Sequence, residues 1–512
     1  MPKKLRKYYP LVLITPLVIT RLLVIHGSSL TFFSDDAIYA SFTRFWVEHD
    51  FSHVFHPFWP PLYPFFSSLL FPLTLSLENA LRLMSLVSAI LLLVPIYFLT
   101  KHFTSKLVAT LTFISVFLLS PIVHYSIFPL SDMLAATLII SSLVTLYFAL
   151  IKRETKLFIS TAILLGLLYL TRSEGTMFFG LTFLYVIPYV IITKLPKKII
   201  PLFLITFLII ISPYVISTHN QLMYWTLNQK FNAQIQQGEA FKIKNGTTWA
   251  QEIWSVKNPD YSSKYWQGGN DFVLNNFYSL QRSFIDKVGK WEVVLLSNFP
   301  LWFISVSLLG LFWLKKKTLW GDLFIVYIMA TAIPITIFAT SVIDTRYLLW
   351  TIPLLIIFVY KAAFNILKTR PTYLLILPFA MTLLLPSFSK QSFDATFYAN
   401  EFTKQHNRQQ LVQVAEFIKT HSTKKEPIIM TRHEAIEFYS HGKTIHIPQI
   451  SYPELIDYAK KNSVDYLVAW NRELFQEKDL KDLADPNANY NELKKEMFLE
   501  TPEGNIVVYT LK

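Results

Sequence analysis

Two adjacent carboxylates, Asp35 and Asp36, follow the first membrane-length apolar segment of the chain. Charge close to hydrocarbon is costly, so an acidic pair at this place indicates a functional site. A carboxylate there could take a proton from a hydroxyl group, and both Asp35 and Asp36 are candidates for this base. Both acids could instead only favour the first turn of a helix capped by Ser34. Asp132, at the start of a later apolar segment, supplies a third acid.

Two arginines occupy comparable places, because Arg172 and Arg346 each stand at the end of an apolar segment. A guanidinium group binds phosphate strongly and could stabilise the charge of a leaving phosphate. Arginines are also ordinary at span ends, where their stems lie along apolar surface. Glu174 lies close enough in the sequence to pair with Arg172. Arg21, inside the first apolar segment, is expected to extend towards the membrane surface in the same way.

The segments that must position these residues are apolar and of membrane length. Of the 512 residues, 53% are hydrophobic and 16% are charged, whereas about a quarter of a soluble chain is charged. The pattern predicts a polytopic α-helical membrane protein with about eleven transmembrane helices of roughly 20 residues. The expected spans are 9–26, 79–100, 107–123, 132–151, 157–171, 175–193, 198–217, 296–314, 321–340, 346–366 and 371–388. Segment 62–77 is short and interrupted by prolines, so we expect it to lie in the membrane interface or to re-enter.

The charge distribution predicts the orientation. Alternate connections between these spans hold 18 Lys and Arg residues against one acid, Glu154, while the whole chain carries +13. These connections are 1–8, 101–106, 152–156, 194–198, 315–317 and 361–370. This is the positive-inside pattern of a membrane protein and not a nucleic-acid footprint. We expect a multi-pass protein of the plasma membrane, or of the endoplasmic reticulum membrane in a eukaryote, with a cytoplasmic N-terminus.

The outer face then receives most of the polar residues. Residues 1–388 are expected to form the transmembrane domain, with outer loops at 27–78 and 218–295, and residues 389–512 an extracytoplasmic domain. The alternating helical and strand patterns of residues 389–512 predict a small α/β fold for this domain. We expect helices at 404–421, 432–439 and 452–462, strands at 427–430, 444–447 and 464–470, and a final hairpin within 492–511.

No nucleotide-binding pattern accompanies these elements. The chain has no G-x-G-x-x-G sequence, and His441-Gly442-Lys443-Thr444 lacks the earlier glycine of a phosphate-binding loop, because position 437 is Glu. An enzyme on the outer face has no cytosolic nucleotide sugars, so an activated sugar must arrive in the membrane. A sugar carried on a polyprenyl phosphate is the obvious donor. Its transfer to a hydroxyl group needs a base, cations for the leaving phosphate and an apolar groove for the lipid tail.

Several stretches resemble a known family, the multi-spanning C-type glycosyltransferases that use polyprenyl- or dolichyl-phosphate sugars. They include the protein O-mannosyltransferases and the aminoarabinose transferase of lipid A. The stretches are SDDAIYA at 34–40, HPFWPPLYP at 56–64, LSDM at 130–133, GLLYLTRSEG at 166–175 and DTRYLL at 344–349. The second departs from the H-P-P-L-Y element of the family by a Phe-Trp-Pro insertion.

The resemblance implies a glycosyltransferase in which the first acid of the outer loop, Asp35, is the catalytic base. It also implies a functional role for Asp132, and substrate contacts for residues of the other matching stretches. These are His56, Tyr63, Arg172, Glu174, Arg346 and Tyr347. The donor would be a polyprenyl-phosphate sugar, and the acceptor a hydroxyl group of a glycan, a lipid or a protein. A one-step displacement with a single base inverts the sugar.

Three alternatives stay open. Asp35, Asp36 and Asp132 offer oxygen ligands that suit Mg²⁺ or Mn²⁺, but the monophosphate branch that the chain resembles implies no metal, and we expect no cofactor. The chain could also be a transporter or lipid flippase of envelope glycolipids. Two observations argue against this alternative, because the spans hold few ionisable residues and show no internal repeat. A third possibility is a non-catalytic scaffold whose outer segment binds a partner.

Overall fold

The computed structural model describes residues 35–227, 299–313, 318–339, 345–367, 409–474 and 479–512, with a few shorter stretches near 15–32, 284–296 and 373–377. Contacts divide the chain into two compact units. The first comprises Met1–Ser28, Thr43–Ile235 and Gly268–Phe402, and the second comprises Ser29–Phe42, Gln236–Gln267 and Thr403–Lys512. The segment that carries Asp35 and Asp36 therefore belongs to the same unit as the C-terminal residues.

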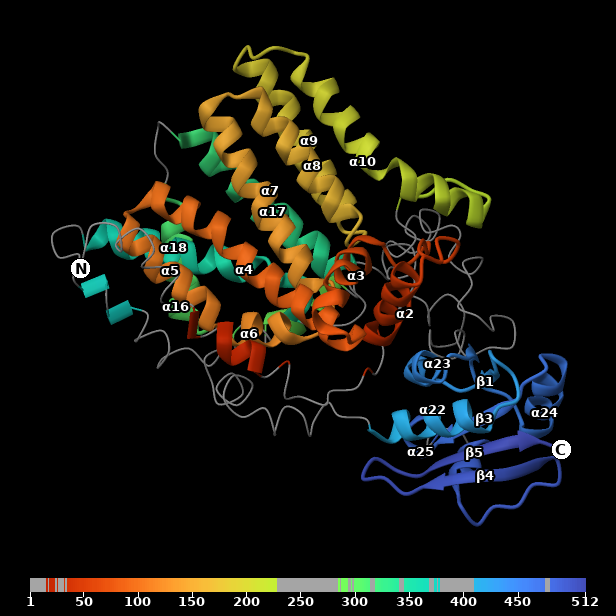
Figure 1. Ribbon diagram of the computed structural model, residues 1–512. Helices are drawn as coiled ribbons and strands as arrows, with labels where there is room; N and C mark the ends of the chain where they lie inside the picture. The colour runs from red at the N-terminus through yellow and green to blue at the C-terminus, as the bar shows by residue number, and fades with distance from the viewer. Residues whose placement is uncertain are drawn as a thin grey trace. The chain divides into compact units, whose positions relative to one another are not determined.

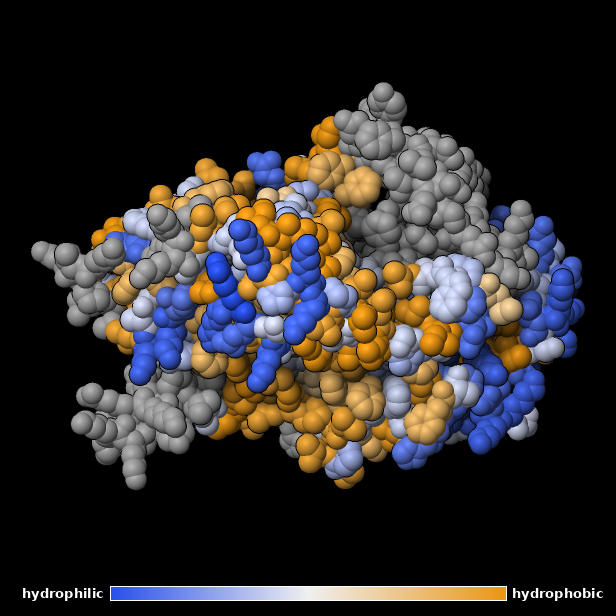
Figure 2. Space-filling view, turned by 90° about the horizontal axis from the view of Figure 1, so that it is seen from above, coloured by the Kyte–Doolittle hydropathy of each residue, from blue (hydrophilic) through white to orange (hydrophobic). Residues whose placement is uncertain are grey.

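The first unit is a bundle of apolar helices (Figure 1). Five helices among the described residues are long and apolar enough to cross a membrane: α4 (Leu77–Phe103), α7 (Asp132–Lys152), α9 (Gly175–Ile192), α10 (Ile199–Leu222) and α17 (Leu319–Ala339). Shorter apolar helices accompany them: α3 (Leu62–Thr74), α8 (Thr155–Tyr169), α16 (Leu301–Leu311) and α18 (Thr351–Ile366). Apolar side chains also cover much of the helical surface visible in Figure 2, as lipid contact requires. The protein is a polytopic helical membrane protein.

The expected spans fare differently. Those at 79–100, 132–151, 175–193, 198–217 and 321–340 are confirmed as long helices. The span expected at 107–123 is broken into α5 (Lys106–Leu118) and α6 (Ser120–Ile127), which bend by 64°, and a proline at the start of α6 explains the break. Those at 157–171, 296–314 and 346–366 are shorter helices, and 62–77 is a 13-residue helix. The segments 9–26 and 371–388 lie largely outside the described residues.

A buried polar network joins three of these helices. On α17, Asp322 Oδ1 accepts a hydrogen bond from Tyr147 of α7 at 3.3 Å, and Oδ2 accepts one from Thr318 at 2.7 Å. Lys361 Nζ of α18 lies 3.9 Å from Asp322 and 4.4 Å from the ring centre of Phe103. The sequence pattern assigned Lys361 to a connection, but only 1% of its side chain is exposed. The network fixes the ends of α7, α17 and α18 against each other.

Arg21, like Lys361, is buried although the sequence pattern predicted a side chain that reaches the membrane surface. It donates to the main-chain carbonyl of Phe117 and lies with its guanidinium 3.5 Å from the centre of that ring. Phe117 belongs to the last turn of α5, where carbonyl groups lack partners within the helix. The broken span therefore provides an acceptor for a buried arginine, and the side chain does not extend to the membrane surface.

The second unit contains a mixed five-stranded sheet in the order β2-β1-β3-β5-β4. The strands are β1 (Ile428–Met430), β2 (Lys443–Ile445), β3 (Tyr466–Trp470), β4 (Leu493–Leu499) and β5 (Ile506–Leu511). The parallel pairs β1–β2 and β1–β3 are separated along the chain by α23 (Glu434–Ser440) and α24 (Tyr452–Lys461), while β4 and β5 form an antiparallel hairpin. Helix α22 (Gln409–His421) precedes the sheet. The order of helices and strands predicted from the sequence is confirmed.

Candidate functional site

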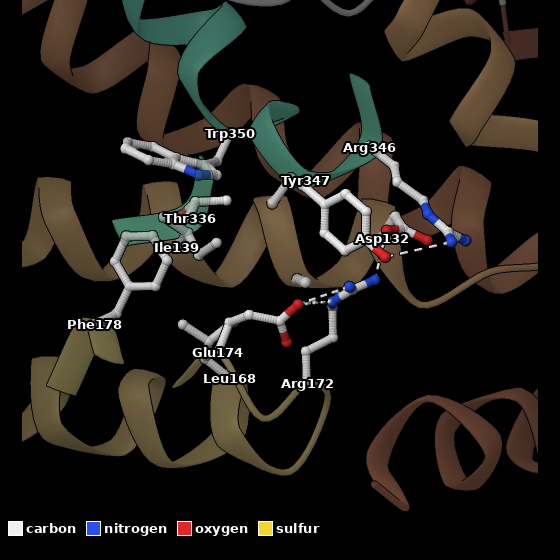
Figure 3. A pocket seen from close by; sticks show the side chains of 12 residues that line it. Asp132, Ile139, Leu168, Arg172, Glu174, Phe178, Thr336, Arg346, Tyr347 and Trp350 are labelled. Atoms are coloured by element: carbon white, nitrogen blue, oxygen red, sulfur yellow. Dashed lines mark hydrogen bonds and ion pairs between the residues drawn. The ribbon is translucent and has the colours of Figure 1, made fainter. Parts of the chain in front are cut away.

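A cavity in the helical unit collects several of the residues singled out by the sequence. Its water-accessible volume is small, about 30 Å³. Its walls come from α7, the turn between α8 and α9, α9, α17 and the segment 346–350. The lining residues are Asp132, Ala135, Ala136, Ile139, Leu168, Arg172, Glu174, Phe178, Thr336, Arg346, Tyr347 and Trp350. Figure 3 shows the charged side chains on one side and Phe178 and Trp350 on the other. The cavity therefore presents cationic side chains next to an apolar wall.

The turn that carries Arg172 is shaped by close backbone packing. Helix α8 ends at Tyr169 and α9 begins at Gly175. A Cβ atom at Gly175 would clash with the main-chain nitrogen of Tyr169, so only glycine fits there. The main-chain N–H of Arg172 donates to the carbonyl of Leu168 at 2.8 Å, and the carbonyl of Arg172 accepts from Gly175 at 3.0 Å. These contacts hold the backbone from which the Arg172 side chain enters the cavity.

Two carboxylates hold Arg172. Its Nη1 lies 2.5 Å from Asp132 Oδ1, and its Nη2 and Nε lie 2.7 Å and 3.2 Å from Glu174 Oε1. Asp132 opens α7, and its side chain is 3% exposed, whereas that of Glu174 is 25% exposed. A charge-assisted hydrogen bond in such a buried place is strong because little water competes for it. Asp132 is thus the interior partner of Arg172, and Glu174 is the outer one.

A second arginine lies close to the same aromatic ring as the first. The guanidinium of Arg172 lies 5.5 Å from the centre of the Tyr347 ring, and that of Arg346 lies 5.2 Å from it. Arg346 Nη2 also lies 3.5 Å from the Tyr347 hydroxyl. Both distances fall within the range of cation–π attraction. Tyr347 therefore holds two cations in the same cavity, although they are far apart in the sequence.

Tyr63 and His56, which the resemblance also implied as substrate contacts, do not line this cavity. Tyr63 is fully buried, and its hydroxyl lies 2.8 Å from the carbonyl of Leu81 and 2.9 Å from Ser85 Oγ. His56 is exposed, and its carbonyl accepts a hydrogen bond from the Tyr214 hydroxyl at 2.8 Å. The inserted residues Phe58 and Pro60 line a separate hollow together with Tyr214. Tyr63 thus packs in the bundle, and His56 anchors a loop through its backbone.

Asp35 and Asp36 begin α2 (Asp35–Val47), and Phe32, which precedes them, packs on the C-terminal domain. The Phe32 N–H donates to the Tyr439 hydroxyl of α23 at 3.0 Å. The Phe32 ring is fully buried and makes an edge contact with Phe438 at 5.1 Å between ring centres. The C-terminal domain therefore holds the chain at Phe32, three residues before the acidic pair.

A further acid lies near this pair. Burial raises the pKa of Glu434, the first residue of α23, to about 7, and the negative charges of Asp35, Glu437 and Asp36 act in the same direction. The sequence predicted the helix at 432–439 but gave no reason to connect it with Asp35. The hydrogen bond between Phe32 and Tyr439 in the same region joins residues that are 407 positions apart, and no local sequence pattern predicts such a contact.

Comparisons with known proteins agree with this architecture. Residues 56–216 match the family described as dolichyl-phosphate-mannose-protein mannosyltransferase. The chain is a lipid-phosphate-sugar-dependent glycosyltransferase. The match includes Asp132, Arg172 and Glu174 and ends before Arg346. No curated protein gives a significant match.

Solved structures show the fold of this glycosyltransferase over nearly its whole length. It is similar to ArnT from Cupriavidus metallidurans bound to undecaprenyl phosphate, with a TM-score of 0.57, 13% identity and 98% of both chains covered. The apo state of that protein gives a TM-score of 0.58 at 12% identity, with the same coverage of both chains. The Archaeoglobus fulgidus oligosaccharyltransferase in complex with Zn and sulfate gives 0.55 at 11% identity, covering 97% of this chain and 73% of that one.

Proposed function

We propose that the enzyme transfers a sugar from a polyprenyl-phosphate donor to a hydroxyl acceptor on the outer face of the membrane, with inversion at the anomeric carbon. The observation that carries the proposal is the pair of arginines held by Tyr347 in a cavity that is charged on one side and apolar on the other. A lipid phosphate has the matching chemistry, because it joins an anionic group to an apolar chain. The ArnT structure with undecaprenyl phosphate supports the same class of ligand.

In this proposal, Arg346 and Arg172 bind the donor phosphate and stabilise the charge that develops as it leaves. Phe178 and Trp350, whose rings meet edge to face at 5.2 Å, contact the first part of the lipid. Tyr347 orients both guanidinium groups. His56 and Tyr63 do not line the cavity, and their role is to shape the outer loop and its neighbouring helices.

Asp35 accepts the proton of the acceptor hydroxyl while that oxygen attacks the anomeric carbon from the face opposite the phosphate. An ordinary aspartate is a weak base with a pKa of about 3.9, so the proton moves late, as the new C–O bond forms. Asp36 is the alternative base. Asp132 is less suited to this role, because its carboxylate is already bound to Arg172, and we assign it to positioning that arginine.

The membrane orientation follows from charge. Lysines and arginines cluster in the connections on one side, so we propose a cytoplasmic N-terminus, an outer catalytic face and an extracytoplasmic C-terminal domain. The bundle would complete about eleven spans, including the expected segments outside the described residues. The acceptor is a hydroxyl group of a glycan, a lipid or a protein.

The test is turnover of labelled donors. Purified enzyme is incubated with a panel of polyprenyl-phosphate hexoses and pentoses carrying a labelled sugar, together with an envelope extract. We expect label to leave one lipid and to appear in a new glycoside with inverted configuration. An enzyme that consumes such a donor with retention of configuration would contradict the one-base mechanism. Movement of the intact lipid across vesicles without a new glycoside would show a transporter instead.

A further inference from the structure

The donor-phosphate position on Arg172 is already occupied by a carboxylate of the protein. Glu174 Oε1 contacts both Nη2 and Nε of Arg172, at 2.7 Å and 3.2 Å. This is the side-on edge through which a guanidinium group binds a phosphate or a carboxylate. The remaining terminal nitrogen, Nη1, is bound to Asp132. A phosphate that used this edge would have to displace Glu174.

The two carboxylates differ in how easily they can leave. The Asp132 side chain is 3% exposed, and its position is fixed as the first residue of α7. The Glu174 side chain is 25% exposed, and it makes no side-chain cap to α9. Glutamate has an additional rotatable bond, so it can turn towards solvent while the backbone stays in place. Glu174 is therefore the exchangeable partner of Arg172.

The charges in the cavity lead to the same conclusion. Asp132, Glu174, Arg172 and Arg346 together carry no net charge. A donor phosphate bound beside Glu174 would add a second anion next to the first, whereas a phosphate in place of Glu174 takes over its contact with Arg172. The start of α9 also favours an anion, because the main-chain N–H groups of a helix N-terminus point out of it.

We propose that Glu174 is a resident competitor of the donor, which holds Arg172 in its binding geometry when the site is empty and yields its place to the lipid phosphate. This inference rests on the proposed function, because it assumes that a lipid phosphate binds Arg172 and Arg346. It assigns Glu174 a role opposite to that of a substrate ligand. Glu174 keeps the guanidinium oriented between turnovers and lowers the affinity for the released polyprenyl phosphate, which helps product to leave.

The test compares the affinity of variants for undecaprenyl phosphate in detergent micelles by calorimetry. Glu174→Gln keeps the shape and removes the charge. We expect its Kd to fall at least about threefold, because a larger share of the molecules then presents an open Arg172. Glu503→Gln is the matched control, since Glu503 pairs with Arg472 at 2.7 Å and its side chain is 29% exposed. It should leave the Kd unchanged.

A second variant guards against a folding defect. Glu174→Ala should also tighten binding, and both variants should melt close to wild type, because Glu174 caps no helix through its side chain. Weaker or unchanged binding in folded Glu174→Gln and Glu174→Ala would overturn the inference. Arg346→Gln and Arg172→Gln distinguish a failure of the competitor role from a failure of the phosphate site. If these two variants lose binding while the Glu174 variants do not gain it, only the competitor role fails. If the arginine variants bind as wild type does, the phosphate site and the competitor role both fail.

Discussion

The buried network around Asp322 is predicted to be a main determinant of stability in the helical unit. Asp322→Asn removes the negative charge that faces Lys361 and disturbs acceptance from Tyr147 and Thr318. Breaking a buried ion pair by removing one partner costs about 3–5 kcal/mol. The 3.9 Å separation and the Phe103 ring at 4.4 Å from the ammonium place this case at the lower end, so we expect a loss of about 3 kcal/mol.

The assay is thermal unfolding of the detergent-solubilised enzyme, followed by the fluorescence of its 12 tryptophans. Thr318→Ala, which removes one hydrogen bond to the same carboxylate, should cost only about 1 kcal/mol. The double variant Asp322→Leu/Lys361→Met should recover most of the loss, because it removes both buried charges together. If Asp322→Asn melts with wild type, or if the double variant is no more stable than the single one, the network does not clamp α7, α17 and α18.

Three further outcomes follow from the structure. Tyr439→Phe removes the acceptor of the Phe32 N–H, a hydrogen bond worth about 1 kcal/mol. Sugar transfer should then slow by roughly fivefold, while the Kd for undecaprenyl phosphate stays unchanged. A changed Kd would contradict the view that this contact positions the acidic pair and not the phosphate site. Gly175→Ala forces a Cβ against the backbone of the α8–α9 turn. The variant should lose about 2 kcal/mol of unfolding free energy and bind phosphate more weakly. Wild-type stability and binding would show that the turn tolerates a side chain. Burial raises the pKa of Glu473 to about 8, above its value in the unfolded chain. The folded state therefore binds the extra proton, and urea unfolding should show stability falling as the pH rises from about 5 to 8. Glu473→Gln should flatten this slope, and an equally steep slope in the variant would show that another group causes it.

The sequence was sufficient where the decisive interactions are local. Helix α7 could be predicted with an acid at its start, because a membrane-length apolar run directly follows Asp132. The α/β order of the C-terminal domain followed from alternating helix and strand patterns, including the hairpin turn at Gly504, whose φ of 107° suits glycine. The break between α5 and α6 also had a local signal, Pro121. The continuous apolar run nevertheless led to the prediction of one unbroken span at 107–123.

The site itself depends on approaches between distant segments. Arg172 and Asp132 are 40 positions apart, and Phe32 and Tyr439 are 407 apart. The pairing of Arg172 with Glu174 could be predicted because the two residues are close in the sequence. The contact of Asp132 with the same guanidinium could not, because it depends on how α7 packs against α8. The sequence likewise assigned Lys361 to a connection, because charge alone does not reveal a buried partner such as Asp322.

The central claim is that this glycosyltransferase uses Asp35 as its base. The most direct test is single-turnover sugar transfer from a bound polyprenyl-phosphate donor, comparing wild type with Asp35→Asn and with the adjacent Asp36→Asn as a matched control. We predict that Asp35→Asn lowers the rate by about 10² or more while donor binding is retained, and that Asp36→Asn has a much smaller effect. Wild-type transfer by Asp35→Asn would contradict the assignment.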